Sequence, residues 1–110
     1  MSGALNLFKT TLANVTNTTT TVYTPPLGYA TVVLMAQVSN NGNSTIQISA
    51  DILRSGNATA LISGASVPTG DAVSVLTGRL ILQYGDQLQF KSSDNTSGQL
   101  VLSYLETLTA

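Results

Sequence analysis

The side chains that could support catalysis or bind a metal ion are few, and the acids among them are Asp51, Asp71, Asp86, Asp94 and Glu106. A glycosidase needs two carboxyl groups held across a cleft. A calcium site needs closely spaced acids such as D-x-D-x-D, a pattern that this sequence lacks. Asp71, Asp86 and Asp94 instead fall in predicted turns, where aspartate accepts backbone N–H hydrogen bonds. We therefore expect turn-forming carboxylates, no catalytic residue and no metal site.

Histidine and cysteine are absent from the sequence. The commonest general base, the thiolate metal ligand and the thiol nucleophile are therefore missing. No serine lies in a nucleophile elbow, and no glycine pattern matches a phosphate-binding loop. Tyrosines could stack on sugars in a carbohydrate-binding module, but isolated tyrosines are more often half-buried strand residues; they are Tyr23, Tyr29, Tyr84 and Tyr104. We expect a protein that is not an enzyme and holds no cofactor.

Charge is scarce throughout the chain. Only 8% of the 110 residues are charged, against roughly 25% in an average globular protein. The basic residues lie far apart, so we expect no nucleic-acid partner; they are Lys9, Arg54, Arg79 and Lys91. Mean hydropathy is +0.25, and a surface with so little charge is poorly protected against association. This favours a surface covered in part by neighbouring chains over one kept soluble by hydroxyl and amide groups.

Targeting signals are not evident in the sequence. The first residues lack the positive region and the apolar core of a signal peptide. No apolar run approaches the length of a membrane-spanning helix. We therefore expect synthesis in the cytoplasm and no membrane partner.

Alternating apolar and polar residues between Gly, Asn and Pro turns predict an all-β chain. The segments are 5–15, 22–24, 30–39, 44–53, 58–63, 72–77, 79–83, 87–92 and 99–108, or about eight strands, with Gly78 as a bulge or bend. The spacing is typical of a single antiparallel β-sandwich of jelly-roll or immunoglobulin-like topology. We expect an N-terminal strand or arm at residues 1–19 and the sandwich domain at 20–110.

Two strand pairings can be predicted in more detail. The turn Asn40-Asn41-Gly42-Asn43 predicts a β-hairpin between 30–39 and 44–53, because Asn-Gly supplies the positive φ of a tight reversal. In strand 87–92, Leu88 and Phe90 are expected to face the core. In strand 30–39 the alternation predicts one shared face for Val32, Leu34, Ala36 and Val38.

The last strand is apolar on both faces. Leu100, Leu102 and Tyr104 share one face, and Val101 and Leu105 share the other. Such a strand is either central in a sandwich or part of a subunit contact, and the two readings stay open. As candidate contact residues we select Leu5, Leu7, Phe8, Val101 and Leu105.

Several short segments occur in an order that carries a family resemblance. The stretch LILQYGDQLQF at 80–90 places Gly85-Asp86 between two alternating runs. Its companions are Tyr23-Thr24-Pro25-Pro26, Val38-Ser39-Asn40, Pro68-Thr69-Gly70 and Ser103-Tyr104-Leu105-Glu106. As an ordered set over about residues 20–107, they resemble segments of small virion structural proteins of tailed bacteriophages.

This resemblance implies a β-sandwich component of a virion. The class includes head decoration (cement) proteins and tail, fibre or baseplate accessories. A short, low-charge chain without a coiled-coil stalk favours the cement role, with the protein on the capsid surface. There it would bridge subunits of the major capsid protein and associate with copies of itself as a homotrimer. A tail fibre, baseplate or connector subunit is the alternative, and a carbohydrate-binding module is a remote one.

Overall fold

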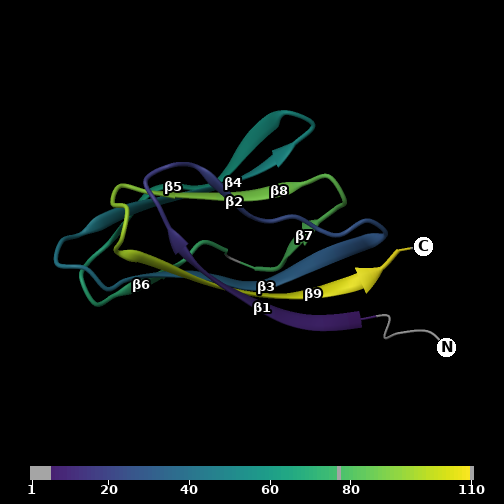
Figure 1. Ribbon diagram of the computed structural model, residues 1–110, viewed down its shortest axis with the longest axis horizontal. Coiled ribbons are helices and arrows are strands. Elements are labelled where there is room, and N and C mark those ends of the chain that lie inside the picture. Colours follow the sequence, from purple (N-terminus) through teal and green to yellow (C-terminus); the bar gives the residue numbers. More distant parts are fainter. Residues whose placement is uncertain (1–5, 77, 110) are drawn as a thin grey trace.

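The computed structural model describes residues 6–76 and 78–109, which form two facing antiparallel sheets (Figure 1). Sheet A contains β1 (Asn6–Val15), β9 (Gly98–Leu108), β3 (Tyr29–Asn40), β6 (Ala72–Ser74) and β7 (Leu80–Leu82). Sheet B contains β2 (Thr20–Tyr23), β8 (Gln87–Ser92), β4 (Ile46–Arg54) and β5 (Asn57–Val67). Among these residues, no helix has the length and apolar character needed to cross a bilayer.

The strand order identifies the topology. Sheet A runs β1-β9-β3-β6, with β7 also paired to β3, and sheet B runs β2-β8-β4-β5. β7 pairs with the first half of β3 and β6 with the second half, so the two short strands occupy one position on either side of Gly78. With that position counted once, each sheet has four strands. The chain crosses to the other sheet after every strand except β4, which pairs with the next strand, β5. This order is that of a jelly roll. The predicted β-sandwich is confirmed, and of the two expected topologies it is the jelly roll.

The core lies between the two sheets and follows from the two-residue period of the strands. Leu88 and Phe90 on β8 are each 1% exposed, as predicted. The buried apolar residues are Val15, Val33, Ala36, Val38, Ile46, Ile48, Ala50, Val67, Val75, Leu82, Leu88, Phe90, Leu100, Leu102 and Tyr104. Val15 belongs to β1, so the segment expected as an arm contributes a strand to sheet A and a side chain to the core.

The predicted hairpin at residues 40–43 is wrong. β3 and β4 lie in different sheets, so this turn carries the chain from sheet A to sheet B. Gly42 does not have a positive φ; it is needed because an added Cβ would overlap the side chain of Ser97. Asn40 is 1% exposed and its amide donates to the carbonyls of Ser44 (2.7 Å) and Val67 (2.9 Å). A local turn signal fixes the reversal but not the sheet that receives the next strand.

The hairpin that does form joins β4 to β5 through Ser55 and Gly56. Both residues have positive φ, 53° and 81°, as a two-residue type I′ turn requires. This turn lies in the gap between the predicted segments 44–53 and 58–63.

A bulge in β3 corrects the predicted face of that strand. The register of β3 against β9 shifts between Val33 and Met35, which makes Leu34 an extra residue. Val33 is fully buried, whereas Leu34 is 41% exposed. Before the bulge, the side chains that face the core are therefore the ones predicted to face outward. Val32 and Leu34 do not share the buried face of Ala36 and Val38. One inserted residue exchanges the two faces of a strand.

Candidate interaction surface

The outer face of sheet A carries a continuous row of apolar side chains. Phe8 on β1 pairs with Leu105 on β9, Leu105 pairs with Val32 on β3, and Val32 pairs with Ile81 on β7. Directly paired residues point to the same side of a sheet, so these four side chains lie next to one another across four strands. We call this outer surface the apolar face; its members are Phe8, Leu12, Val32, Leu34, Ile81, Val101 and Leu105.

Several side chains of the apolar face are largely exposed to solvent and could contact a partner. Phe8 is 77% exposed, Leu12 73% and Ile81 53%. At about 200 Å² for a large apolar side chain, these residues and Leu34 leave on the order of 500 Å² of apolar area open. Patches of roughly this size on single chains are often functional.

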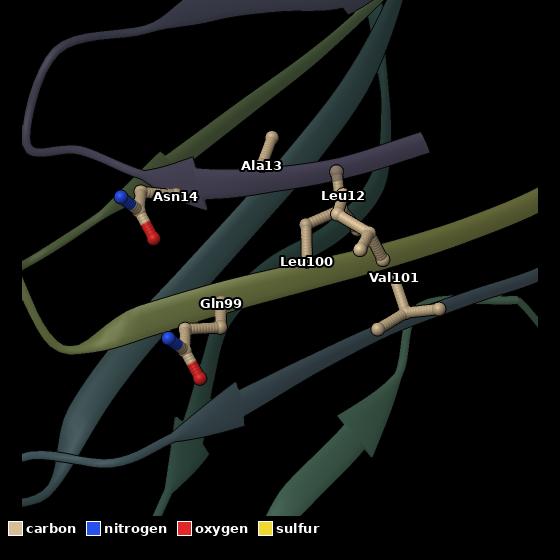
Figure 2. Close-up of a pocket in the computed structure, with 6 residues that line it drawn as sticks. All are labelled: Leu12, Ala13, Asn14, Gln99, Leu100 and Val101. Atoms are coloured by element: carbon tan, nitrogen blue, oxygen red, sulfur yellow. The ribbon is translucent and has the colours of Figure 1, made fainter. Parts of the chain in front are cut away.

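The apolar face is not flat. Phe8, Thr10, Leu34 and Ser103 are among the residues around a shallow hollow of about 300 Å³. A second open hollow of about 490 Å³ lies over β1 and β9 (Figure 2). There Leu12 pairs with Val101, while the amides of Asn14 and Gln99 lie side by side at one end. The small side chains of Thr10 and Ser103 lie between the larger Phe8 and Leu34, and this difference in size makes the hollow. Side chains of a partner can fit into such a hollow.

The sides of β1 and β9 that face the core form a polar network. The Lys9 ammonium lies 2.7 Å from Oε1 of Glu106, whose side chain is 4% exposed. The Tyr23 hydroxyl donates to Oε2 of Glu106 (2.6 Å) and lies 2.7 Å from the Thr31 hydroxyl. Burial raises the pKa of Glu106, but the hydrogen bonds from Lys9 and Tyr23 outweigh it and hold that pKa below its usual value. Burial and the Glu106 carboxylate raise the pKa of Tyr23.

This network fixes β1 to the sandwich. Lys9 comes from β1, Glu106 from β9, Tyr23 from β2 and Thr31 from β3. One carboxylate thus joins two strands of sheet A to an edge strand of sheet B. The Lys9 side chain is 46% exposed, but its charged end is engaged by Glu106.

The structure brings together three of the five contact residues selected from the sequence. Phe8, Val101 and Leu105 lie on the apolar face. Leu7 pairs with Glu106 and points to the opposite side of β1, and Leu5 lies outside the described residues. The contact role of all five stays a prediction.

Sequence reasoning missed four residues of this face: Leu12, Val32, Leu34 and Ile81. Leu12 was signalled by its spacing of four from Phe8, which puts both on one side of a strand. Val32 and Leu34 were hidden by the bulge in β3. Ile81 could be placed only by the pairing of β7 with β3.

The carboxylates expected in turns make turn hydrogen bonds. Asp86 is 1% exposed, accepts the backbone N–H of Gln83 (2.8 Å) and forms a two-pronged pair with Arg54, 2.7 and 2.6 Å. The Arg54 guanidinium holds the pKa of Asp86 below its usual value. Asp71 accepts the N–H of Ala72, and Asp94 that of Thr96. No group of three potential metal ligands gathers within 6–76 and 78–109.

The tyrosines do not form a common platform. Tyr23 and Tyr104 contact each other inside the sandwich, with ring centroids 4.4 Å apart, and Tyr104 is 5% exposed. Tyr84 is 62% exposed in the turn before β8. This arrangement fits strand packing better than stacking on a sugar.

Comparison with known proteins supports the fold. The chain is similar to a chain from the structure of Bacillus endospore appendages, described as a novel family of disulfide-linked pili, with 12% identity and a TM-score of 0.54 over 94% of this chain and 87% of that one. At this identity the likeness shows the fold alone. No family model and no curated protein matches the sequence. Because cysteine is absent here, the disulfide linkage in that description does not carry over.

Proposed function

We propose that this chain is a structural subunit of a virion, without enzymatic activity, that docks on a protein lattice through the apolar face. The observation that carries the proposal is the row Phe8–Leu105–Val32–Ile81, apolar on all four strands and open to solvent at both ends. An apolar surface of this extent is stabilised when a partner covers it.

The finer form of the proposal is a head decoration (cement) protein of a tailed bacteriophage that bridges subunits of the major capsid protein. Its support is the resemblance of residues 20–107, the single compact sandwich and the scarcity of charge. A chain of the same fold in an appendage described as a pilus is in keeping with a structural role. The tail accessory role shares this support and differs in where the chain sits and in how many copies.

Copy number on purified particles separates the two roles. Quantitative mass spectrometry of particles from cultures that produce the chain should find hundreds of copies, and electron cryomicroscopy should place them on the head. Tens of copies or fewer, with density on the tail, would establish the tail role instead. Absence of the chain from particles would overturn the proposal.

A matched pair of variants tests the apolar face itself. Ile81→Lys places a charge in the row, whereas Gln89→Lys places the same charge on the outer face of sheet B. Charged groups resist transfer from water into an apolar contact, so Ile81→Lys should lose attachment to particles and Gln89→Lys should keep it. Equal attachment of the two variants would show that another surface binds.

A further inference from the structure

The free edge of β1 is an unprotected sheet edge. β1 pairs with β9 over ten consecutive residues without a register shift, and no strand covers its other side among the described residues. Such an edge presents a row of backbone N–H and C=O groups that can pair with another strand.

The other sheet edges carry the features that normally prevent pairing. β6 and β7 have three residues each, and β2 has four. β5 is long, but its register against β4 shifts twice and Gly64 has a φ of 65°. Short length and bulges discourage edge-to-edge association. Of the edges that the described residues form, β1 alone is both long and regular.

Charge does not protect β1 either. Lysine is the usual protecting residue of an edge strand, and the single charged residue of β1 is Lys9. Its ammonium is held at 2.7 Å by the buried carboxylate of Glu106, on the side of the strand that faces the core. The outward side of β1 carries Phe8, Thr10, Leu12 and Asn14, none of them charged.

We propose that two copies of this chain form a two-fold dimer by antiparallel pairing of their β1 edges, with Thr10 of each copy opposite Thr10 of the other. In this register Phe8 of each copy lies opposite Leu12 of its partner, so the two most exposed residues of the apolar face become cross-strand neighbours at two places. Paired threonines are themselves favourable neighbours across antiparallel strands.

The neighbouring registers are worse. A register centred on Lys9 sets two lysines directly opposite, which is destabilising. A register centred on Thr11 sets Phe8 opposite Asn14 and separates it from Leu12. A register centred between two residues sets the apolar face of one copy beside the core-facing side of the other. Among the registers centred at or next to Thr10, side-chain chemistry therefore favours the one centred on Thr10.

The contact area lies near the lower limit for a specific interface. The exposed fractions of Phe8 and Leu12, at about 200 Å² per large side chain, give at most about 600 Å² of apolar area for the two copies, and the flanks that face each other are the part that becomes covered. The paired backbones add to this, and stable interfaces begin at about 1,000 Å² in total. The dimer would also present the remainder of both apolar faces on one side of a single extended sheet. That geometry makes attachment to a repeating lattice bivalent.

Charge complementation at residue 10 tests this register. Thr10 is exposed, so Thr10→Lys and Thr10→Glu should both fold. Sedimentation should give the wild-type chain about twice its 11.4 kDa mass and each variant the monomer mass, because like charges then lie directly opposite. A one-to-one mixture of the variants should recover the dimer. A monomeric wild type, or variants that remain dimeric, would overturn the proposal.

Cross-linking provides a second readout on a chain that has no cysteine of its own. Opposite residues of antiparallel strands have Cα atoms roughly 4.5–5.5 Å apart, within the range that a disulfide spans. Thr10→Cys should therefore form a covalent dimer on oxidation. Thr59→Cys, on the exposed edge of β5, is the matched control and should not. Efficient cross-linking of the control alone would contradict the β1 pairing.

The dimer proposal goes beyond the virion role, differs from the homotrimer that the resemblance implies, and can fail separately from the virion role. Ile81 lies on β7, at the opposite edge of sheet A from β1. Ile81→Lys should therefore abolish particle attachment and leave the dimer intact, whereas Thr10→Lys should abolish the dimer. A change in dimer mass caused by Ile81→Lys would contradict the β1 interface.

Discussion

Sheet A and sheet B share one inner core, and their outer faces are chemically different. The outer face of sheet A carries Phe8, Leu12 and Ile81, each more than half exposed. Among the described residues, no large apolar side chain of sheet B is exposed to that degree. Its outer side carries polar residues that bond to one another, as Thr21 does by donating to Gln87 (2.9 Å).

This difference shows that the inward and outward residues of an alternating strand serve different purposes. The inward residues of both sheets are apolar because folding requires a core. The outward residues are free to vary, and water selects polar side chains unless another contact intervenes. The outer side of sheet B therefore behaves as a solvated surface, and the apolar face of sheet A is the exception, which we propose is covered by a partner.

The two phenylalanines of the chain give the largest expected contrast. Phe90 is 1% exposed in the core, and Phe8 is 77% exposed on the apolar face. Phe90→Ala should lower the free energy of unfolding by roughly 3–5 kcal/mol. Phe8→Ala should change it by less than about 0.5 kcal/mol while weakening association. Urea denaturation of both variants, each made in the monomeric Thr10→Lys chain so that association does not contribute, measures the contrast. Similar losses would mean that Phe8 is packed within the single chain.

Two buried carboxylates should have a smaller effect on the free energy of unfolding. One is paired with a cation from sheet A and the other with a cation from sheet B. Asp86 is held by Arg54 from sheet B, and Glu106 by Lys9 from sheet A. Both have a pKa below the usual value when folded. Their stabilisation is therefore present at neutral pH and is lost as the pH falls below about 4, because the unfolded chain then binds more protons.

Urea denaturation between pH 7 and pH 3 measures this effect. The free energy of unfolding should be nearly flat at the upper end and fall steeply at the lower end. Asp86→Asn and Glu106→Gln should each lower stability at pH 7 by about 1–3 kcal/mol and flatten the acid limb. Amide hydrogen exchange should show the loosening in β1 for Glu106→Gln and in the β7–β8 turn for Asp86→Asn. An unchanged acid limb would show that these carboxylates do not titrate abnormally.

The sequence predicted the sandwich because alternation and turn residues are local signals. It predicted the inward side of β8 and the break at Gly78 for the same reason. It failed at residues 40–43, where the destination of the chain depends on how Asn40 and Gly42 pack against other loops. It failed in β3 because one inserted residue at the bulge is invisible to a two-residue period.

The candidate surface was accessible from sequence only in pieces. Phe8, Val101 and Leu105 could be selected because each is apolar on a side that the core does not need. Their assembly with Val32 and Ile81 depends on strand order, which is a property of long-range pairing. Leu7 was selected on apolarity alone, and the phase of β1 turns it away from this face.

The smallest expected effect concerns the polar outer side of sheet B. Gln89 pairs with Thr21 on one side and Asp51 on the other, so Gln89→Leu adds one apolar side chain among polar neighbours. Its mirror is Ile81→Gln, which removes one side chain from an apolar row. Both lie on the surface, and each should change the free energy of unfolding by less than about 0.5 kcal/mol.

Binding of a hydrophobic dye distinguishes these two variants where stability does not. An isolated apolar side chain is ordinary on protein surfaces, whereas a contiguous patch attracts apolar partners. Ile81→Gln should therefore lower dye binding, and Gln89→Leu should leave it near the wild-type level. Gln89→Leu could instead raise dye binding as much as Ile81→Gln lowers it. That result would mean that dye binding depends on the number of apolar side chains and not on their alignment across four strands. The contrast between the two faces would then be one of composition alone.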